Sequence, residues 1–230
     1  MSEVVRKMFS DISGDYDLLN DLLSFGRHRS WKKRFVRRLN IPQNGRHLDV
    51  ATGTGDIAER IVKQYGRSVW VKGIDFSESM IIKAKYRKNP KFDNLSFDVG
   101  DATNLNFSDN EFDSVSISFG IRNIPELLTA ISEMTRVIKP GGLLAIMEFG
   151  TPDSPFNTIY KLYSKYILPL IGKIISGNDF AYTYLPETIK KFPYGKEFQK
   201  LLMDTNNFSE VEIMKLEFGT VYAYFCRKKS

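Results

Sequence analysis

The stretch Leu48-Asp49-Val50-Ala51-Thr52-Gly53-Thr54-Gly55-Asp56 decides how this chain folds. It joins an apolar segment, His47–Ala51, to a segment with helical spacing, Ile57–Tyr65, and glycines lie at the junction. Glycine lets the backbone turn sharply and approach a ligand closely, and this strand–turn–helix arrangement is typical of nucleoside-binding α/β domains. The motif therefore predicts the first strand and the first ligand loop of an α/β sheet.

The alternation of strand and helix patterns continues outward from this motif as far as Phe149. Consecutive parallel strands need crossover connections, so the order favours a mostly parallel sheet with helices on both faces. Lys139-Pro140-Gly141-Gly142 predicts a turn before the fifth strand. The expected strands are His47–Ala51, Val69–Asp75, Leu95–Val99, Phe112–Ser118 and Leu143–Phe149, and the expected helices are Ile57–Tyr65, Glu78–Lys88 and Pro125–Val137.

The two ends of the chain depart from this alternation. A basic helix is expected at Arg29–Leu39, before the first strand, and a last helix at about Lys196–Thr205. Two strand patterns follow, Val211–Leu216 and Thr220–Arg227, and they predict a terminal antiparallel pair.

Composition and charge narrow the class of protein. The chain has 230 residues and a formal net charge of +6, which favours anionic neighbours such as phosphate, nucleic acid or an acidic membrane surface. A single cysteine, Cys226, rules out an intramolecular disulfide and is normal in a reducing cytoplasm. The longest apolar-rich stretch, Tyr166–Ile175, is too short to span a bilayer. We expect a cytoplasmic protein that has access to the inner face of the cell membrane.

Two further predicted strands end in groups that suit a nucleoside. Asp75 ends the second strand, where a carboxylate accepts hydrogen bonds from ribose hydroxyls, and Phe76 follows it. After the third strand, Asp101 offers a carboxylate and Ala102 a backbone amide for an adenine edge. Three such features in sequence order predict a nucleoside ligand at the carboxyl edge of the sheet.

The nature of the nucleoside is open between a methyl donor and a dinucleotide. Gly53–Ala58 also fits the G-x-G-x-x-A fingerprint of nicotinamide enzymes. However, Asp49 and Asp56 would attract the sulfonium and amino groups of S-adenosylmethionine and repel a pyrophosphate. The Tyr-x-x-x-Lys pair of short-chain dehydrogenases occurs only as Tyr224 and Lys228, on a predicted terminal strand. We therefore expect S-adenosylmethionine as the cofactor and no metal.

Two strings are more specific than the nucleoside motifs: Ser118-Phe119-Gly120-Ile121-Arg122-Asn123 and Tyr182-Thr183-Tyr184-Leu185-Pro186. With them the chain resembles the ubiquinone/menaquinone biosynthesis C-methyltransferases over nearly its whole length. Leu105–Ser108 departs from the family, which usually has prolines there, and this concerns only the local loop. The other matching blocks are Met8-Phe9, Tyr16–Asn20, Leu22–Gly26, His28-Arg29 with Trp31, Leu48–Asp56, Gly73–Ser77, Asn110–Asp113, Arg136–Gly142, Glu148-Phe149 and Tyr182–Ile189.

The resemblance implies a class I (Rossmann-like) methyltransferase fold and methylation of a ring carbon on a polyprenylated quinol. The acceptor would be demethylmenaquinol, giving menaquinol, or the benzoquinol precursor of ubiquinone. We favour the naphthoquinol because the N-terminus starts almost directly at the first family block. Taken with the residue chemistry above, the candidate donor-binding residues are Asp49, Thr52, Gly53, Thr54, Gly55, Asp75, Phe76, Asp101, Ala102 and Ser118.

Carbon methylation needs a group that stabilises the phenolate formed from the quinol. Arg122 follows the fourth strand and is the candidate for this role, with a structural salt bridge as the alternative; Asn123 would orient it or bind a quinol oxygen. His28 is the candidate general base or a surface histidine of the cap. Tyr184 is a candidate to bind a quinol oxygen; the alternative is a buried tyrosine that packs with its hydroxyl satisfied. His47 opens a strand and is expected to be structural.

Two segments combine an apolar stripe with basic flanks. In Arg29–Leu39 the stripe is Trp31, Phe35 and Leu39, and a second stripe lies in Phe156–Ile175. Each is either a core face with solvated lysines or part of an apolar entrance for the isoprenoid tail with a basic rim. The second alternative predicts peripheral, salt-sensitive contact with an anionic membrane.

Other classes of function are less well supported. Base-amine methyltransferases carry a Pro-Pro string after the fourth strand, where this chain reads Ser118–Asn123, and cytosine-carbon enzymes need a Pro-Cys nucleophile, whereas Cys226 follows Phe225. We therefore expect no nucleic-acid substrate, while a second copy of the chain stays open as a partner. A non-catalytic nucleoside-binding subunit is the remaining alternative, and the intact donor motifs speak against it.

The expected organisation is a single domain over residues 1–230. Within it, residues 1–45 form an N-terminal helical cap, 46–150 the donor-binding core, 151–195 a substrate-side insertion, and 196–230 the last helix and the terminal strands.

Overall fold

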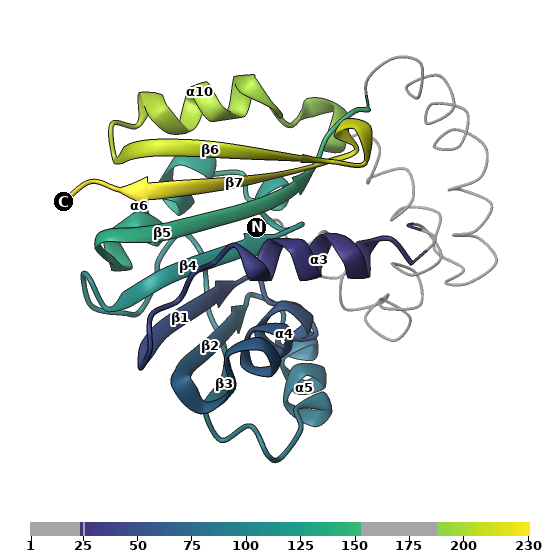
Figure 1. Cartoon of the computed structure of the whole chain (residues 1–230), viewed down its shortest axis with the longest axis vertical. Helices are drawn as coiled ribbons and strands as arrows, with labels where there is room; N and C mark the ends of the chain where they lie inside the picture. Colours follow the sequence, from purple (N-terminus) through teal and green to yellow (C-terminus); the bar gives the residue numbers. More distant parts are fainter. Residues whose placement is uncertain (1–23, 25, 153–187) are drawn as a thin grey trace.

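The structure is a computed structural model and describes residue 24 and residues 26–152 and 188–230 (Figure 1). Within these residues one seven-stranded sheet has the order β3-β2-β1-β4-β5-β7-β6. Strands β1 to β5 pair in parallel, and β7 is antiparallel to both β5 and β6. The predicted parallel sheet with a terminal antiparallel pair is therefore confirmed. The strands are β1 Gly45–Val50, β2 Val69–Asp75, β3 Leu95–Val99, β4 Phe112–Ser118, β5 Ile138–Phe149, β6 Phe208–Leu216 and β7 Val221–Lys228.

Helices cover both faces of this sheet, as the alternating pattern predicts. Most buried apolar residues of α3, α4 and α5 belong to one cluster, and the buried apolar residues of α6 and α10 belong to another. In Figure 1, α3 and α4 lie in front of the sheet, whereas α6 lies behind it. The helices are α3 His28–Arg37, α4 Asp56–Tyr65, α5 Glu78–Arg87, α6 Leu127–Val137 and α10 Lys196–Asp204.

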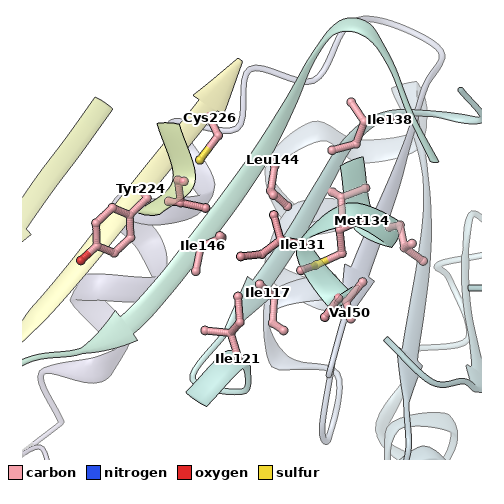
Figure 2. Packing of buried hydrophobic residues seen from close by; sticks show 14 of the residues in the cluster. Val50, Ile117, Ile121, Ile131, Met134, Ile138, Leu144, Ile146, Tyr224 and Cys226 are labelled. Carbon is pink, nitrogen blue, oxygen red and sulfur yellow. The ribbon is translucent and has the colours of Figure 1, made fainter. Parts of the chain in front are cut away.

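The cluster under α6 and α10 is the larger block of the core. Figure 2 shows Ile131 and Met134 of α6 packed against Ile117 of β4 and Leu144 of β5. All four side chains are fully buried. Burial of these side chains stabilises the central strands, whose carboxyl ends carry the candidate site.

The apolar stripe of α3 faces the other cluster and not an entrance for a lipid tail. Trp31, Phe35 and Leu39 are 4%, 0% and 1% exposed. They pack in the cluster that also contains residues of α4 and β2. For this helix, therefore, the apolar-entrance alternative is wrong and the core face is right, because the sheet leaves an apolar face that α3 has to cover. The second stripe, Phe156–Ile175, lies outside the described residues.

The turn predicted before the fifth strand is wrong. Lys139–Gly142 predicts a turn before the fifth strand, but β5 begins at Ile138 and includes this motif. Phe112 pairs with Ile138 and Ser114 pairs with Leu143, so the intervening residues of β5 bulge out of the ladder. Gly141 allows this with a φ of 71°. A bulge absorbs extra residues without ending strand pairing, which the turn signal alone does not reveal.

Among the described residues, no helix is long and apolar enough to cross a membrane. The division of the chain into cap, core, insertion and terminal part stays a prediction.

Candidate donor and substrate site

The carboxyl ends of β1 to β4 meet at one edge of the sheet and form a pocket. Four of the predicted donor residues line it: Asp75 at the end of β2, Phe76 directly after it, and Asp101 and Ala102 after β3. Because parallel strands end at the same edge, residues far apart in the chain are brought together there. The pocket also contains four residues that we did not predict, namely Val50, Ala51, Gly100 and Ile124. All four are sequence neighbours of predicted site residues, which is the signal that was overlooked.

The Gly-rich loop after β1 has a backbone that requires glycine. Gly55 has a φ of 85°, and a Cβ there would lie 2.6 Å from Cζ of Phe97. Gly73 of β2 meets the same ring, since its Cβ would lie 2.6 Å from Cδ1 of Phe97. Gly53 also has a positive φ, of 56°, but nothing lies within 4 Å of a Cβ built on it. The loop therefore packs against the ring of Phe97 at Gly55. At Gly53 no protein atom is near, which leaves the space that close approach of a ligand requires.

Asp75 is tied to this loop by its carboxylate. The Gly53 N–H donates to Oδ2 and the Ser77 N–H donates to Oδ1, both at 2.8 Å. Burial raises the pKa of Asp75 above its usual value, and the two backbone donors oppose the shift. Each carboxylate oxygen has a second acceptor position, so Asp75 retains the capacity to bind ribose hydroxyls.

Asp101 is held in a turn by one oxygen only. Its Oδ1 accepts from the backbone N–H and from the hydroxyl of Thr103, at 2.8 and 2.7 Å. Among the described residues, no hydrogen bond reaches its Oδ2. This acceptor lies on a residue that lines the pocket, and it matches the amino group of an adenine.

Asp49 and Thr52 lie beneath the loop and do not line the pocket. Asp49 is 1% exposed; its Oδ2 accepts from the Thr52 hydroxyl at 2.6 Å and its Oδ1 from the Ser116 hydroxyl at 2.7 Å. Burial raises the pKa of Asp49 to about 6, although these hydrogen bonds and Lys32 lower it. Their position indicates that they hold the loop from the inside.

The remaining donor candidates are more peripheral to the pocket. Thr54 is buried, and Nη1 of Arg87 donates to its Oγ1 at 2.9 Å, so this hydroxyl contacts the end of α5. Gly55 precedes α4 as its N-terminal cap residue. Ser118 is the half-buried last residue of β4.

An ion pair joins the loop to the N-terminal helix. Nζ of Lys32, on α3, lies 2.8 Å from Oδ2 of Asp56, the first residue of α4, and the Lys32 side chain is 8% exposed. Arg60 binds the other oxygen of Asp56 at 2.8 Å. Burial works to raise the pKa of Asp56, but Lys32 and Arg60 outweigh it and lower the pKa to about 2. The negative charge at this helix N-terminus is thus maintained.

On the acceptor side, Arg122 forms a buried ion pair. Its Nη1 lies 2.6 Å from Oε1 of Glu148 and donates to the carbonyl of Phe119 at 2.7 Å. The side chains of Arg122 and Glu148 are 7% and 1% exposed. The predicted salt-bridge alternative for Arg122 is therefore present. Its Nε atom has no hydrogen-bond partner within the described part of the chain.

Two aromatic rings accompany this ion pair. The centroids of Phe119 and Phe149 are 4.4 Å apart, and the Arg122 guanidinium lies 5.4 Å from the centroid of Phe149. Phe119 adopts a φ of 56°, which is unusual for a bulky residue and marks a constrained position. Sequence reasoning did not assign roles to Phe119, Glu148 or Phe149. The sequence feature that could have identified them is their position, directly after β4 for Phe119 and at the end of β5 for Glu148 and Phe149.

The structure places the remaining catalytic candidates as follows. Asn123 is buried at the end of a short helix, η2 (Ile121–Asn123). His28 begins α3, is 8% exposed, and its Nδ1 lies 2.9 Å from Oγ of Ser24. It is therefore buried, whereas a surface position was the expected alternative. Tyr184 lies outside the described residues. His47 is buried within the sheet, as expected for a structural residue.

Comparison with known proteins identifies the family. Residues 1–228 match the ubiE/COQ5 methyltransferase family. The chain belongs to this family. A curated relative from Staphylococcus saprophyticus, named demethylmenaquinone methyltransferase, is 40% identical over 94% of this chain and 93% of the relative. A relative from Geobacter sulfurreducens, named ubiquinone/menaquinone biosynthesis C-methyltransferase UbiE, is 42% identical over 96% of this chain and 87% of the relative.

Solved structures agree with this family on the fold. A SAM-dependent methyltransferase from Thermotoga maritima superposes with a TM-score of 0.67 at 19% identity, over 97% of this chain and 99% of that chain. A phosphoethanolamine methyltransferase of Haemonchus contortus, in complex with S-adenosylhomocysteine, gives 0.63 at 17% identity, over 87% and 52%. The ubiE/COQ5 protein is thus a class I methyltransferase and an enzyme that uses S-adenosylmethionine, and the nicotinamide alternative is excluded.

Proposed function

We propose that this ubiE/COQ5 methyltransferase methylates a ring carbon of a polyprenylated quinol, converting demethylmenaquinol to menaquinol, with the benzoquinol precursor of ubiquinone as the alternative acceptor. The observation that carries the proposal is similarity of about 40% over nearly the whole chain to relatives named for this reaction. One of the two relatives is named for menaquinone alone and the other for both quinones. The naphthoquinol is the shared element.

The donor pocket has the groups that S-adenosylmethionine requires. In this proposal Asp75 accepts hydrogen bonds from ribose hydroxyls, and the unused Oδ2 of Asp101 accepts one from the adenine amino group, which the remaining acceptor capacity of both carboxylates supports. The open backbone at Gly53 leaves room for the methionine part of the donor. When bound, S-adenosylmethionine supplies an electrophilic methyl group on a sulfonium. The buried charge of Asp49 beneath the loop favours this cation.

The acceptor carbon has to carry electron density, which the quinol supplies when a hydroxyl group loses its proton. Arg122 carries a guanidinium cation and lies at the carboxyl edge, and its proposed role is to stabilise the phenolate oxygen. The paired rings of Phe119 and Phe149 offer an apolar surface for the quinol ring and keep water away from it. Asn123 is a second polar residue in this region that would orient the phenolate or bind a quinol oxygen. Tyr184 stays a candidate to bind a quinol oxygen.

The group that removes the quinol proton is assigned to His28 in this proposal. His28 is buried at the start of α3 and contacts the Ser24 hydroxyl, an arrangement that can fix its tautomer. Replacing His28 with Gln is expected to lower kcat and to remove the acid limb of the pH–rate profile. An unchanged profile would assign the proton transfer to another group.

The direct test is methyl transfer by the purified protein. Labelled S-adenosylmethionine is incubated with reduced demethylmenaquinol, with the demethylated benzoquinol, or with RNA, and label is counted in the organic and aqueous fractions. The proposal expects organic-extractable label with the naphthoquinol. Label on RNA would support the nucleic-acid alternative, and binding without turnover on any acceptor would support a non-catalytic subunit. Lipid extracts of cells lacking the protein are expected to contain a quinone that is one methyl group lighter.

We also propose that the protein contacts an anionic membrane surface through α3, α4 and α5. These helices carry ten Lys and Arg residues and three acidic residues, whereas α6 and α10 carry three of each. Among the described helices, the excess of basic residues therefore lies on one face of the sheet. Ile82 and Tyr86 of α5, one helical turn apart, are 61% and 91% exposed on it. Basic residues around exposed apolar side chains suit the interface of an acidic bilayer.

A further inference from the structure

A chain of buried hydrogen bonds runs beneath the donor loop. Nδ1 of His47 lies 2.7 Å from Oγ of Ser114, and its Nε2 lies 2.9 Å from Oγ of Ser116. The Ser116 hydroxyl lies 2.7 Å from Oδ1 of Asp49, whose other oxygen binds Thr52. From Ser114 to Asp49, each of these side chains is at most 1% exposed. The chain connects the interior of the sheet with the first ligand loop.

The register of the strands produces this arrangement. In the parallel ladder of β1 and β4, His47 is opposite Ser114 and Asp49 is opposite Ser116. Residues two apart on a strand point to the same face, so all four side chains share one face of the sheet. Leu48 and Val50 point to the opposite face, into the cluster under α6.

The direction of each hydrogen bond follows from the donors present. Ser116 has one hydroxyl hydrogen, and the carboxylate of Asp49 can only accept, so this hydrogen is donated to Asp49. Ser116 then accepts from His47, which requires the tautomer with hydrogen on Nε2. Nδ1 accepts in turn from Ser114. Burial lowers the pKa of His47 to about 3, so the ring stays neutral at any working pH.

The other groups that face Asp49 do not replace this chain. Lys32 of α3 lowers and Asp56 of α4 raises its pKa, and these two residues form an ion pair with each other. On the β2 side Asp49 is opposite Gly73, which has no side chain to donate. The donors that orient Asp49 are therefore Thr52 and Ser116, and only Ser116 is itself oriented by a further residue of the sheet.

We propose that His47 is a positioning residue for the donor site. By donating to Ser116 it holds the Asp49 carboxylate in a single orientation, and Asp49 in turn holds Thr52 and the loop in the conformation that binds S-adenosylmethionine. The inference rests on the proposed role of this loop as the donor site. A purely structural histidine would affect the stability of the fold, whereas a positioning histidine also affects donor affinity and its pH dependence.

The test compares full-length variants by calorimetric titration with S-adenosylmethionine. His47→Leu removes the Nε2–H donor, and the Kd is expected to rise about tenfold, the size typical of one lost buried hydrogen bond. His47→Gln retains an N–H that reaches Ser116 and is expected to stay within about threefold of the parent. The acid limb of donor binding moves to higher pH in His47→Leu, because the Ser116 hydroxyl that donates to Asp49 is then no longer oriented by His47 and favours the charged form of Asp49 less.

The matched control is Val71→Ala. Val71 is opposite His47 in the ladder of β1 and β2, is 3% exposed, and takes no part in the hydrogen-bond chain. It is expected to lower the melting temperature at an unchanged Kd. Ser116→Ala is expected to match His47→Leu in Kd, and the double variant is expected to be no weaker than Ser116→Ala alone.

Three results would decide against the inference. Donor affinity that falls in Val71→Ala as much as in His47→Leu, in proportion to lost stability, assigns His47 a structural role only. A parent-like Kd in His47→Leu overturns it directly. A parent-like Kd in both His47→Leu and Asp49→Asn shows instead that this loop is not the donor site, which is a failure of the proposed function.

Discussion

Arg122 and Glu148 form an ion pair of 2.6 Å, with both side chains almost completely removed from solvent. The pair joins the end of β5 to the short helix that follows β4. Glu148 also accepts from the backbone N–H of Phe149 at 2.8 Å and from that of Arg122 at 3.4 Å. The carboxylate thus orders the backbone that carries the aromatic rings as well as the guanidinium.

Glu148→Ala is expected to lower the free energy of unfolding by about 3–5 kcal/mol, because it leaves a buried guanidinium without its counter-charge. Glu148→Gln retains acceptors for the backbone and is expected to lose less. Urea unfolding measures both. In a double-variant cycle with Arg122→Met, the two losses are expected to be strongly non-additive. Additive losses would mean that the two side chains act independently.

The neighbouring loops at the site fit each other closely at Gly120 and Ala51. A Cβ on Gly120 would lie 2.7 Å from the Cβ of Ala51, which has a φ of 51°. Gly120→Ala is therefore expected to destabilise the fold by about 1–3 kcal/mol through overpacking and to weaken donor binding, since Ala51 lines the pocket.

Ala51→Gly supplies the control for this clash, because it removes the opposing Cβ and suits the positive φ. The double variant Ala51→Gly, Gly120→Ala is expected to recover most of the stability and the donor affinity. A double variant as weak as Gly120→Ala would show that the damage arises elsewhere, for example at η2.

The pH dependence of stability is expected to depend on Asp49. Burial raises its pKa from 3.8 to about 6, so the folded protein holds this proton more tightly than the unfolded chain. The stabilising contribution of Asp49 to the free energy of unfolding is therefore present below pH 3.8 and is lost as the pH rises to about 6. Compared with the parent, Asp49→Asn is therefore expected to gain up to roughly 3 kcal/mol in free energy of unfolding across this window.

The effect of Asp49 is isolated only by the difference in free energy of unfolding between Asp49→Asn and the parent, because other groups also make stability depend on pH. Burial depresses the pKa of His47 from 6.5 to about 3, so His47 gives a slope of the opposite sign over an overlapping range. The Asp56 contribution is lost at lower pH, as the pH falls from 3.8 to about 2. Exposed Asp93→Asn serves as the control variant. A pH-independent difference for Asp49→Asn would contradict the prediction.

Membrane contact is expected to depend on one helical face. Reversing the exposed residues Lys33, Arg34 and Arg37 of α3 to Glu is expected to abolish flotation with vesicles rich in anionic lipid, at about 1 kcal/mol per basic residue. Reversing Lys196 and Lys200 of α10 is expected to leave flotation unchanged. Raised ionic strength should reproduce the α3 result. Equal effects of the two sets, or flotation that ignores salt, would exclude this face as the contact.

Some parts of the fold and site were predictable because they depend on local pattern. Apolar runs with Gly and Asp at their ends located β2, β3 and β4 to the residue. The strand-end rule then correctly grouped Asp75 with Asp101, since parallel strands end at one edge. The bulge in β5 was not predictable, because only pairing with β4 shows that Lys139–Gly142 stays within the strand.

The sequence by itself determined the class of protein: the strand–helix order, the glycines of the first loop, and the strings that identify the family. These features depend on backbone conformation and short-range spacing, which neighbouring residues set. Only the tertiary structure decided that the α3 stripe is a core face, that Arg122 is paired with Glu148, and that His47 connects to Asp49. Each of these depends on contacts between distant segments, and such contacts arise only when strand register and helix packing bring the side chains together.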